Sequence, residues 1–255
     1  TEMTRPLYFP LTIIDGIFGN PEEVLKLAKS LEYQEPSGTN YPGVASKKTI
    51  AEIDVDLAKY CCQQVFSPFW DPRDHEIEWH VVQDFQKITP HSDRGHLLNN
   101  GLIHADNNVG QLATAIIYLN DAPEGNVGTS FYEKKKDFKS TYITGSTCPP
   151  EYLEATKEYH RTGVSNPRLE ELIIEHRSKF NETIRVQQKA NRMVLFPAEI
   201  WHAQTTYGTE DRYSVRTFVN NANIKQILPS DKSTASTLIK SNNTVQARWP
   251  MQRTN

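Results

Sequence analysis

The sequence contains few cysteines, no long apolar run and little net charge, and each of these absences argues against a class of protein. Its three cysteines lack the spacing of a disulfide framework, so a cysteine-stapled secreted scaffold is disfavoured and a reducing, cytoplasmic setting is expected. No apolar run approaches the length that crosses a bilayer, and no secretion signal opens the chain, so no membrane partner is expected. A formal net charge of −3 gives no electrostatic case for a nucleic-acid partner.

The composition is that of a folded chain with many short strands. Of 255 residues, 37% are hydrophobic, which is enough to bury a core, and we expect one domain over residues 1–255. Helical patterns cover residues 21–31 and 54–66. The segments with strand-like patterns are 76–85, 112–119, 129–132, 193–196 and 213–219. Helices followed by short strands predict a mainly β fold, a sandwich or jelly roll braced by helices.

A polar, charge-rich stretch at about residues 133–188 interrupts the strands. It has helical patterns near 150–160 and 168–181 and lacks a linker composition, so we expect an insertion or lid on the same domain. Because loops on a rigid scaffold tend to carry specificity, this stretch is where substrate choice is expected to reside. The tail after residue 227 is rich in Ser, Thr, Asn and Lys and is expected to be loosely ordered.

Two histidines and one aspartate are the candidate metal ligands. Side chains at positions i and i+2 of a strand share one face, so His104 and Asp106 can reach a single point. His202 supplies a second imidazole. Two histidines and a carboxylate on one face of an octahedral metal form the facial triad of non-haem iron(II) oxygenases. A structural zinc site would instead tend to fill its coordination sphere with protein ligands, usually including cysteine.

Arg212-Tyr-Ser214 is a candidate anion site. A guanidinium fork gives a carboxylate two parallel charge-assisted hydrogen bonds, and Ser214 would share the strand face of Arg212. Tyr118 lies within an apolar predicted strand, where its phenol needs a hydrogen-bond partner that a bound carboxylate would provide. Arg216 shares the same strand face and is the alternative to Arg212, and a core tyrosine is the alternative for Tyr118.

Five motifs resemble, in the same order along the chain, those of the 2-oxoglutarate/iron(II)-dependent oxygenases, in particular the prolyl-hydroxylase-like branch. They are His104-Ala-Asp106, Ala115-Ile-Ile-Tyr-Leu-Asn-Asp121, Gly128-Thr-Ser-Phe131, Leu195-Phe-Pro followed by His202, and Arg212-Tyr-Ser-Val. Ile14-Asp15, the Pro21 helix and Tyr41-Pro-Gly43 are similar to phage and bacterial members of unassigned substrate. The resemblance covers about residues 10–222, with 133–188 unmatched.

The resemblance implies a double-stranded β-helix, cupin-like core and a set of site residues. The implied iron ligands and catalytic centre are His104, Asp106 and His202. Arg212 would bind the distal carboxylate of 2-oxoglutarate, with Tyr118 and Ser214 assisting. Some relatives carry lysine where Arg212 stands, and the usual Gly-Gly before the threonine is here Val127-Gly128.

The implied activity is an oxidation that uses Fe(II), 2-oxoglutarate and O2. The expected reaction is hydroxylation of an unactivated C–H bond in an amino acid, a peptidyl side chain or a small metabolite. Asp106 argues against a halogenase, which lacks this carboxylate. Two alternatives remain, namely a binding module on the same fold and a metal-dependent cupin-type enzyme that does not use 2-oxoglutarate.

A second His-x-Asp pair competes with the first. His91-Ser-Asp93 is followed by His96 and taken alone is as good a pair of ligands. It lies in a loop-like stretch beside proline and glycine, and it is farther from Tyr118 than His104 is. We therefore prefer His104 and expect His91 to His96 to form a solvated loop.

Overall fold

The computed structural model describes most of the chain between residues 9 and 226. The described segments are 9–34, 43–93, 95–106, 111–136, 150–162, 164–165, 167–226, 240–241 and 245–246. Residues 137–149 of the expected insertion and most of the expected loose tail lie outside them.

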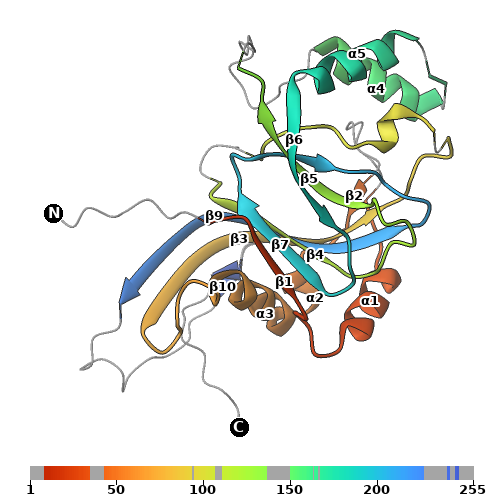
Figure 1. Ribbon diagram of the computed structural model, residues 1–255. Helices are drawn as coiled ribbons and strands as arrows, with labels where there is room; N and C mark the ends of the chain where they lie inside the picture. The colour runs from red at the N-terminus through yellow and green to blue at the C-terminus, as the bar shows by residue number, and fades with distance from the viewer. Residues whose placement is uncertain are drawn as a thin grey trace.

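The larger of two antiparallel sheets contains eight strands in the described part of the chain (Figure 1). Its strands are, in spatial order, β1 (Thr12–Asp15), β7 (Arg192–Pro197), β4 (Ala113–Tyr118), β9 (Arg212–Gln226), β3 (His75–Ile88), β11 (Val245–Gln246) and β10 (Lys240–Ser241), with β2 (Gly43–Ala45) also paired to β3. The central β4 is buried at every position, in keeping with a sequence that is largely apolar apart from Thr114.

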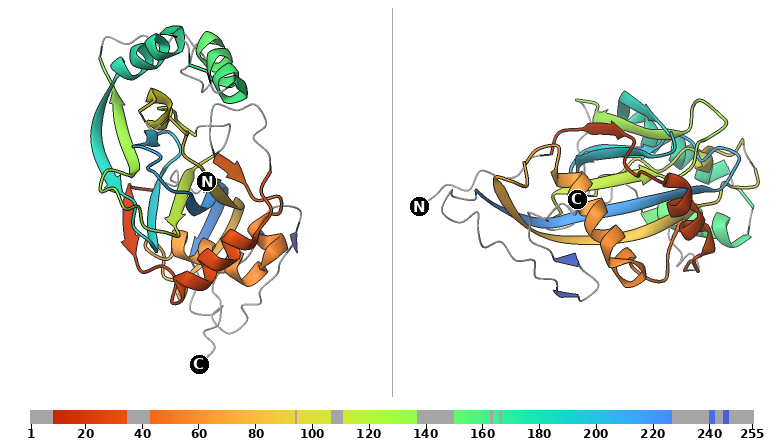
Figure 2. Two further views of the ribbon diagram at one scale, coloured as in Figure 1. Left: turned by 90° about the vertical axis from the view of Figure 1, so that its right-hand side faces the viewer. Right: turned by 90° about the horizontal axis from the view of Figure 1, so that it is seen from below.

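The smaller sheet has the order β6-β5-β8 and extends to the segment around His104. Its strands are β5 (Gly128–Lys134), β6 (Phe180–Gln187) and β8 (Trp201–Gln204). An isolated antiparallel pair between His104 and His202 places the His104 segment beside β8. From β4 onward the chain crosses repeatedly between the sheets, with β4, β7 and β9 in the larger and β5, β6 and β8 in the smaller, and the two sheets face each other (Figures 1 and 2). This is the expected jelly roll, a double-stranded β-helix.

Three N-terminal helices cover the outer face of the larger sheet (Figure 2). They are α1 (Pro21–Ser30), α2 (Ile50–Ile53) and α3 (Val55–Phe66). Asn20 stands at the N-cap of α1 without a side-chain capping bond, whereas Thr49 and Glu52 form a reciprocal capping box on α2. Alternate residues of β4, including Ala115 and Ile117, join this outer core, so the intervening residues face the space between the sheets.

Two further helices lie at the opposite end of the molecule, α4 (Pro150–Thr162) and α5 (Pro167–Ser178) (Figure 2). They pack on a 3-10 helix, η1 (Leu97–Asn99), through a small apolar core of their own. The expected insertion bounds were wrong at both ends, because β5 continues to Lys134 and residues 180–187 form β6, which pairs with β5.

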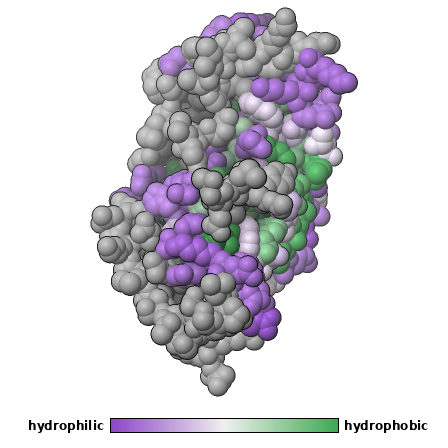
Figure 3. Space-filling view, turned by 90° about the vertical axis from the view of Figure 1, so that its left-hand side faces the viewer, coloured by the Kyte–Doolittle hydropathy of each residue, from purple (hydrophilic) through white to green (hydrophobic). Residues whose placement is uncertain are grey.

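Some apolar side chains remain exposed on strands at the edges of the two sheets. Ile13 of β1 and Ile184 of β6 are 48% and 44% exposed. In Figure 3, green apolar atoms gather at mid-height, with purple polar atoms around them. No helix among the described residues is long and apolar enough to cross a membrane.

Candidate metal centre

His104 and His202 are placed side by side by main-chain pairing. The His104 amide donates to the His202 carbonyl at 2.9 Å, and the His202 amide returns the bond at 2.8 Å. Asp106 follows two residues later, and its amide donates to the Ala198 carbonyl at 2.8 Å. These bonds hold His104 and Asp106 on extended backbone next to His202. The three side chains therefore point toward one another.

The three side chains form a compact group of potential ligands. Nε2 of His104 lies 3.5 Å from Oδ1 of Asp106, and Nε2 of His202 lies 3.6 Å from Oδ2. One ligand atom from each residue lies within 4.8 Å of the other two. In the part of the chain that the structure describes, this is the one group of three or more His, Cys, Asp or Glu side chains that could hold a metal ion.

Both imidazoles are oriented through their other ring nitrogen. Nδ1 of His104 lies 2.8 Å from the Leu102 carbonyl, and Nδ1 of His202 lies 3.0 Å from the Ile200 carbonyl. A carbonyl can only accept, so Nδ1 carries the proton and Nε2 presents a lone pair to the group. Bonds of this kind fix the tautomer and ring orientation of metal-binding histidines.

Asp106 is oriented by a threonine that the sequence analysis did not single out. Thr114 Oγ1 donates to Asp106 Oδ2 at 2.6 Å, and Gln111 Nε2 donates to the same hydroxyl at 2.9 Å. Burial raises the pKa of Asp106, but the bond from His104, the charges of both histidines and the bond from Thr114 lower it further than burial raises it. The group is therefore a carboxylate at neutral pH.

The two histidines differ in their surroundings. Burial, followed by the charge of His104, lowers the pKa of His202 to about 4. Burial also lowers the pKa of His104, but the hydrogen bond and charge of Asp106 outweigh it, so the net shift is upward. The His104 side chain is 39% exposed and that of His202 only 7%, so the group opens to solvent on the side of His104.

Arg212 is buried beside this centre with part of its guanidinium unpartnered. Its residue is 1% exposed, and Nη1 donates to Oε1 of Gln204, which stands two residues after His202 on β8. Nε and Nη2 have no hydrogen-bond partner in the described chain. These two nitrogens form the side-on fork that matches a carboxylate. Gln204 binds the guanidinium and lies two residues after His202 on β8, so this strand connects the fork to the metal centre.

Tyr118 lies next to Arg212 and pairs with Ser214, and the hydroxyl groups of both residues bond to protein atoms. The Arg212 guanidinium lies 5.4 Å from the centre of the Tyr118 ring. The Tyr118 hydroxyl is 2.6 Å from Thr129 Oγ1, and Ser214 Oγ donates to Gln86 Oε1 at 3.3 Å. Tyr118 and Ser214 are paired across β4 and β9.

Arg216 has a different environment from Arg212. Its Nε and Nη2 donate to the two carboxylate oxygens of Asp84, each at 2.8 Å. The ion pair is partly buried, with side-chain exposures of 22% for Arg216 and 16% for Asp84. Its side-on fork is therefore already occupied by a protein carboxylate.

The second His-x-Asp pair does not assemble into a ligand group. His91 packs edge-on against Tyr159 of α4, with ring centres 5.3 Å apart, and His96 stacks on the same ring at 4.3 Å. His96 also accepts from the Leu98 amide and bonds Ser165 Oγ at 2.7 Å. Asp93 Oδ1 accepts from the Gly95 amide. Ser92, Asp93 and Gly95 are exposed, as expected of a solvated loop, whereas His91 and His96 pack against α4 and His96 is only 5% exposed.

The sequence analysis missed Thr114 and Gln204, although the two-residue alternation of a strand places each of them on the same face as a residue that it named. Thr114 shares its strand face with Tyr118, four residues later, and Gln204 shares that of His202. A small cavity of about 10 Å³ also borders Arg212, and its lining includes Gln188 and Glu124. Both Glu124 oxygens are buried without a hydrogen-bond partner in the described chain.

Comparison with solved structures gives distant similarities. HygX from Streptomyces hygroscopicus, solved with nickel and 2-oxoglutarate bound, is 14% identical, with 82% of each chain covered and a TM-score of 0.48. The non-haem alpha-ketoglutarate-dependent epimerase SnoN from nogalamycin biosynthesis is 13% identical, with 92% of this chain and 93% of SnoN covered and a TM-score of 0.48. A Pseudomonas putida prolyl-4-hydroxylase is 11% identical, with 83% and 92% covered and a TM-score of 0.40.

The sequence comparisons identify a family without assigning an activity. No curated protein matches the sequence. The profile of a family of unknown function, DUF6445, matches residues 8–211, which is most of the chain. The chain belongs to the DUF6445 family.

Proposed function

We propose that this protein is a non-haem iron(II) oxygenase that uses 2-oxoglutarate as co-substrate. The observation that carries the proposal is the convergence of His104, Asp106 and His202, next to a buried arginine whose carboxylate-binding fork has no partner in the described chain. Neither feature alone would be sufficient, because metal groups and buried arginines both occur in other settings.

The donor set fits iron(II) better than a structural metal. Two imidazole nitrogens and one carboxylate oxygen come from one side, which leaves the remaining octahedral positions open. Structural zinc sites are closed by a fourth protein ligand, commonly a cysteine. Among the described residues no such ligand joins the group, and Cys61 and Cys62 are buried in the outer core with the helices.

Arg212 fits the distal carboxylate of a small dicarboxylate. A buried charge is costly unless it is paired, so a guanidinium with two free donor atoms is poised to bind an anion. 2-Oxoglutarate would bind the fork through one carboxylate, and its other end would be available to the metal. Tyr118 and Ser214 would shape the site around the guanidinium rather than replace it as the anchor.

Iron and 2-oxoglutarate, when bound, would supply the oxidising power that inserts an oxygen atom from O2 into an unactivated C–H bond. The chain would contribute positioning and water exclusion. Thr114 would hold the Asp106 carboxylate in place, and the carbonyls of Leu102 and Ile200 would hold the imidazoles. Buried apolar side chains between the sheets would keep water from the centre. They are Ile116, Phe131, Val186, Val194 and Phe196.

The proposed substrate is an amino acid, a peptidyl side chain or a small metabolite, which would approach from the exposed side of His104. Hydroxylation is the proposed outcome. The unpaired, buried thiols of Cys61 and Cys62 suit a reducing compartment, and we propose a cytoplasmic enzyme on that ground.

The test is an anaerobic titration of metal-free protein with iron(II) and then 2-oxoglutarate, followed by visible absorption of the chelate. We expect a charge-transfer band in the wild type and in His91→Ala, and none in His104→Ala. On admission of O2, succinate should form from 2-oxoglutarate. Wild-type protein that binds iron but gives neither the band nor succinate would rule out the proposal.

Glu124 favours one second candidate, a metal-dependent cupin-type enzyme that does not use 2-oxoglutarate. Its buried carboxylate lines the same cavity as Arg212 and is an internal anion that could compete for the fork. The charge-neutral variant Glu124→Gln separates the two. If a ligand carboxylate occupies the fork, Glu124→Gln should bind 2-oxoglutarate at least as tightly as the wild type. The second candidate is correct if neither the wild type nor Glu124→Gln binds 2-oxoglutarate and metal-dependent activity persists in Arg212→Ala.

A further inference from the structure

We propose that the C-terminal end of α5 positions the metal centre, with His176 and Arg177 acting as positioning residues for His104. The inference rests on the proposed function insofar as His104 is taken to be a metal ligand. It assigns the helical insertion a role in building the centre, in addition to any role in substrate choice.

Three successive carbonyl groups carry the inference. The Gly101 carbonyl accepts from Arg177 Nη1 at 2.8 Å, and the Ile103 carbonyl bonds His176 Nε2 at 3.0 Å. Between them, the Leu102 carbonyl accepts from Nδ1 of His104 and sets the orientation of that ring. The two outer carbonyls are held by α5, so their position fixes the peptide groups that orient the imidazole.

The His104 segment needs such support because it is an incomplete strand. Its main-chain hydrogen bonds to β8 are those of the His104–His202 pair and one from the Gly101 amide to the Gln204 carbonyl, at 3.0 Å. A strand with a neighbour on one side only leaves half of its backbone groups without a sheet partner. Two of these groups are satisfied by the side chains of α5.

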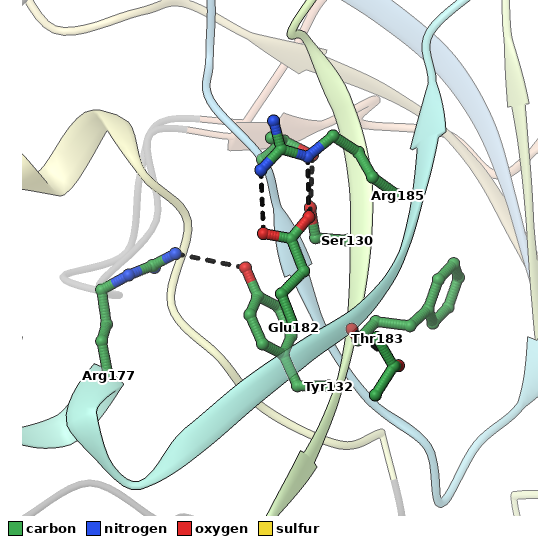
Figure 4. A network of polar contacts seen from close by, with 8 residues as sticks. Ser130, Tyr132, Arg177, Glu182, Thr183 and Arg185 are labelled. Atoms are coloured by element: carbon green, nitrogen blue, oxygen red, sulfur yellow. Dashed lines mark hydrogen bonds and ion pairs between the residues drawn. The ribbon is translucent and has the colours of Figure 1, made fainter.

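Arg177 also ties the segment to β5, the central strand of the smaller sheet. Its Nη2 donates to the Tyr132 hydroxyl at 3.2 Å, and its guanidinium lies 5.9 Å from the centre of that ring. Figure 4 shows Arg177 projecting from the end of α5 toward the Tyr132 hydroxyl. Tyr132 pairs with Trp201, next to His202. One side chain thus connects the segment of His104 with the strand beside that of His202.

The helix itself packs on the rest of the domain through apolar side chains. Leu169, Leu172 and Ile173 of α5 are buried against Leu98, with Leu97 and Leu102 packed alongside. The same helix therefore packs on the segment that precedes His104 and hydrogen bonds to it. His176 is 1% exposed, so its bond to the Ile103 carbonyl is protected from competing water.

The test compares apolar and conservative variants of both residues in full-length, metal-free protein. Arg177→Met and His176→Leu remove the donors, whereas Arg177→Lys and His176→Gln keep one. Arg168→Gln is the matched control on the same helix, because Arg168 pairs only with exposed acidic side chains in the described chain. Cobalt(II) is the probe, since its visible spectrum reports both affinity and ligand geometry.

We expect Arg177→Met and His176→Leu to weaken cobalt(II) binding about tenfold or more and to alter its spectrum, because support of a metal ligand is worth about 10–100-fold in affinity. His176→Gln should restore binding toward the wild-type value, and Arg168→Gln should not change it. Wild-type affinity and spectrum in a folded Arg177→Met would overturn the inference. If His176→Leu does not fold, the two Arg177 variants decide the question.

Amide hydrogen exchange separates this inference from the proposed function. In metal-free protein, residues 101–104 should exchange at least tenfold faster in Arg177→Met than in the wild type, while β4 is unaffected. Wild-type protein that binds no cobalt(II) would refute the proposed function, yet faster exchange in the variant would still support the positioning role. Unchanged exchange would refute that role whatever the metal result.

Discussion

Replacing Arg212 by methionine should stabilise the ligand-free protein while abolishing its response to 2-oxoglutarate. Burial of an unpaired charge costs several kcal/mol, and Arg212 is 1% exposed with two nitrogens unpartnered in the described chain. The variant leaves Gln204 Oε1 without this donor, a loss of about 1–3 kcal/mol. The first effect is the larger, so we expect Arg212→Met to raise the free energy of unfolding by about 1–3 kcal/mol.

The ligand response should change in the opposite direction. With metal present and 2-oxoglutarate at about a hundred times its Kd, the wild type should gain about 2.7 kcal/mol of stability from binding. Arg212→Met should gain almost none at the same concentration. Both quantities come from urea unfolding followed by circular dichroism, under anaerobic conditions, with and without the co-substrate.

Arg216→Met is the matched control for this prediction. It lies on the same strand face but removes the partner of Asp84, so we expect a loss of about 1–3 kcal/mol in ligand-free stability. Its gain from 2-oxoglutarate should equal that of the wild type. The reasoning fails if Arg212→Met responds to 2-oxoglutarate like the wild type. Its stability part fails separately if ligand-free Arg212→Met is several kcal/mol less stable than the wild type.

Three further predictions address the metal centre and its supports. Thr114→Val removes the hydroxyl that holds the metal-site carboxylate at 2.6 Å, and metal affinity in a chelator competition should fall about tenfold; Thr114→Ser should retain it. Gly101→Ala would place a Cβ 2.7 Å from the Gln204 amide nitrogen, so it should lower the free energy of unfolding by about 1–3 kcal/mol. Gly125→Ala, whose Cβ would meet nothing closer than 3.9 Å, should change stability by less than about 0.5 kcal/mol, and equal effects of the two would contradict the steric argument. Burial is the main cause that lowers the pKa of His176 to about 4. Below about pH 6.5 the unfolded chain therefore binds a proton at this residue that the native state does not bind. The contribution of His176 to the free energy of unfolding of metal-free protein should therefore fall by up to about 3 kcal/mol between pH 6.5 and 4, and because His202 has a similarly lowered pKa, His176→Gln should reduce the slope rather than abolish it in urea unfolding at a series of pH values.

The sequence predicted the parts of the fold that depend on the two-residue alternation of side chains along a strand. The alternation of strand side chains placed His104 and Asp106 on one face, and the largely apolar run around Ile116 identified a central strand. β6 was missed because residues 181–185 are all exposed, and only Phe180 and Val186 are buried within it. A strand with so little burial has no apolar pattern for a sequence to display.

Contacts between distant segments were beyond any local pattern. The sequence analysis named both Arg212 and Arg216 but could not separate their roles, because the deciding partner, Asp84, lies 132 residues away on β3. The hold of α5 on the Gly101 and Ile103 carbonyls likewise joins side chains to a backbone more than seventy residues earlier. A backbone acceptor has no residue identity, so nothing in the sequence marks it.

The register of β3 against β9 gives the physical reason why the two arginines have different environments. Residues that face each other across an antiparallel pair project from the same side of the sheet. Asp84 is opposite Arg216, whereas the residue opposite Arg212 is Ile88, which is fully buried. A displacement of the ladder by four residues would instead place Arg212 opposite Asp84. β3 therefore provides a counter-charge opposite Arg216 and an apolar residue opposite Arg212. Arg212 is the arginine that is hydrogen bonded to Gln204, on the strand of His202.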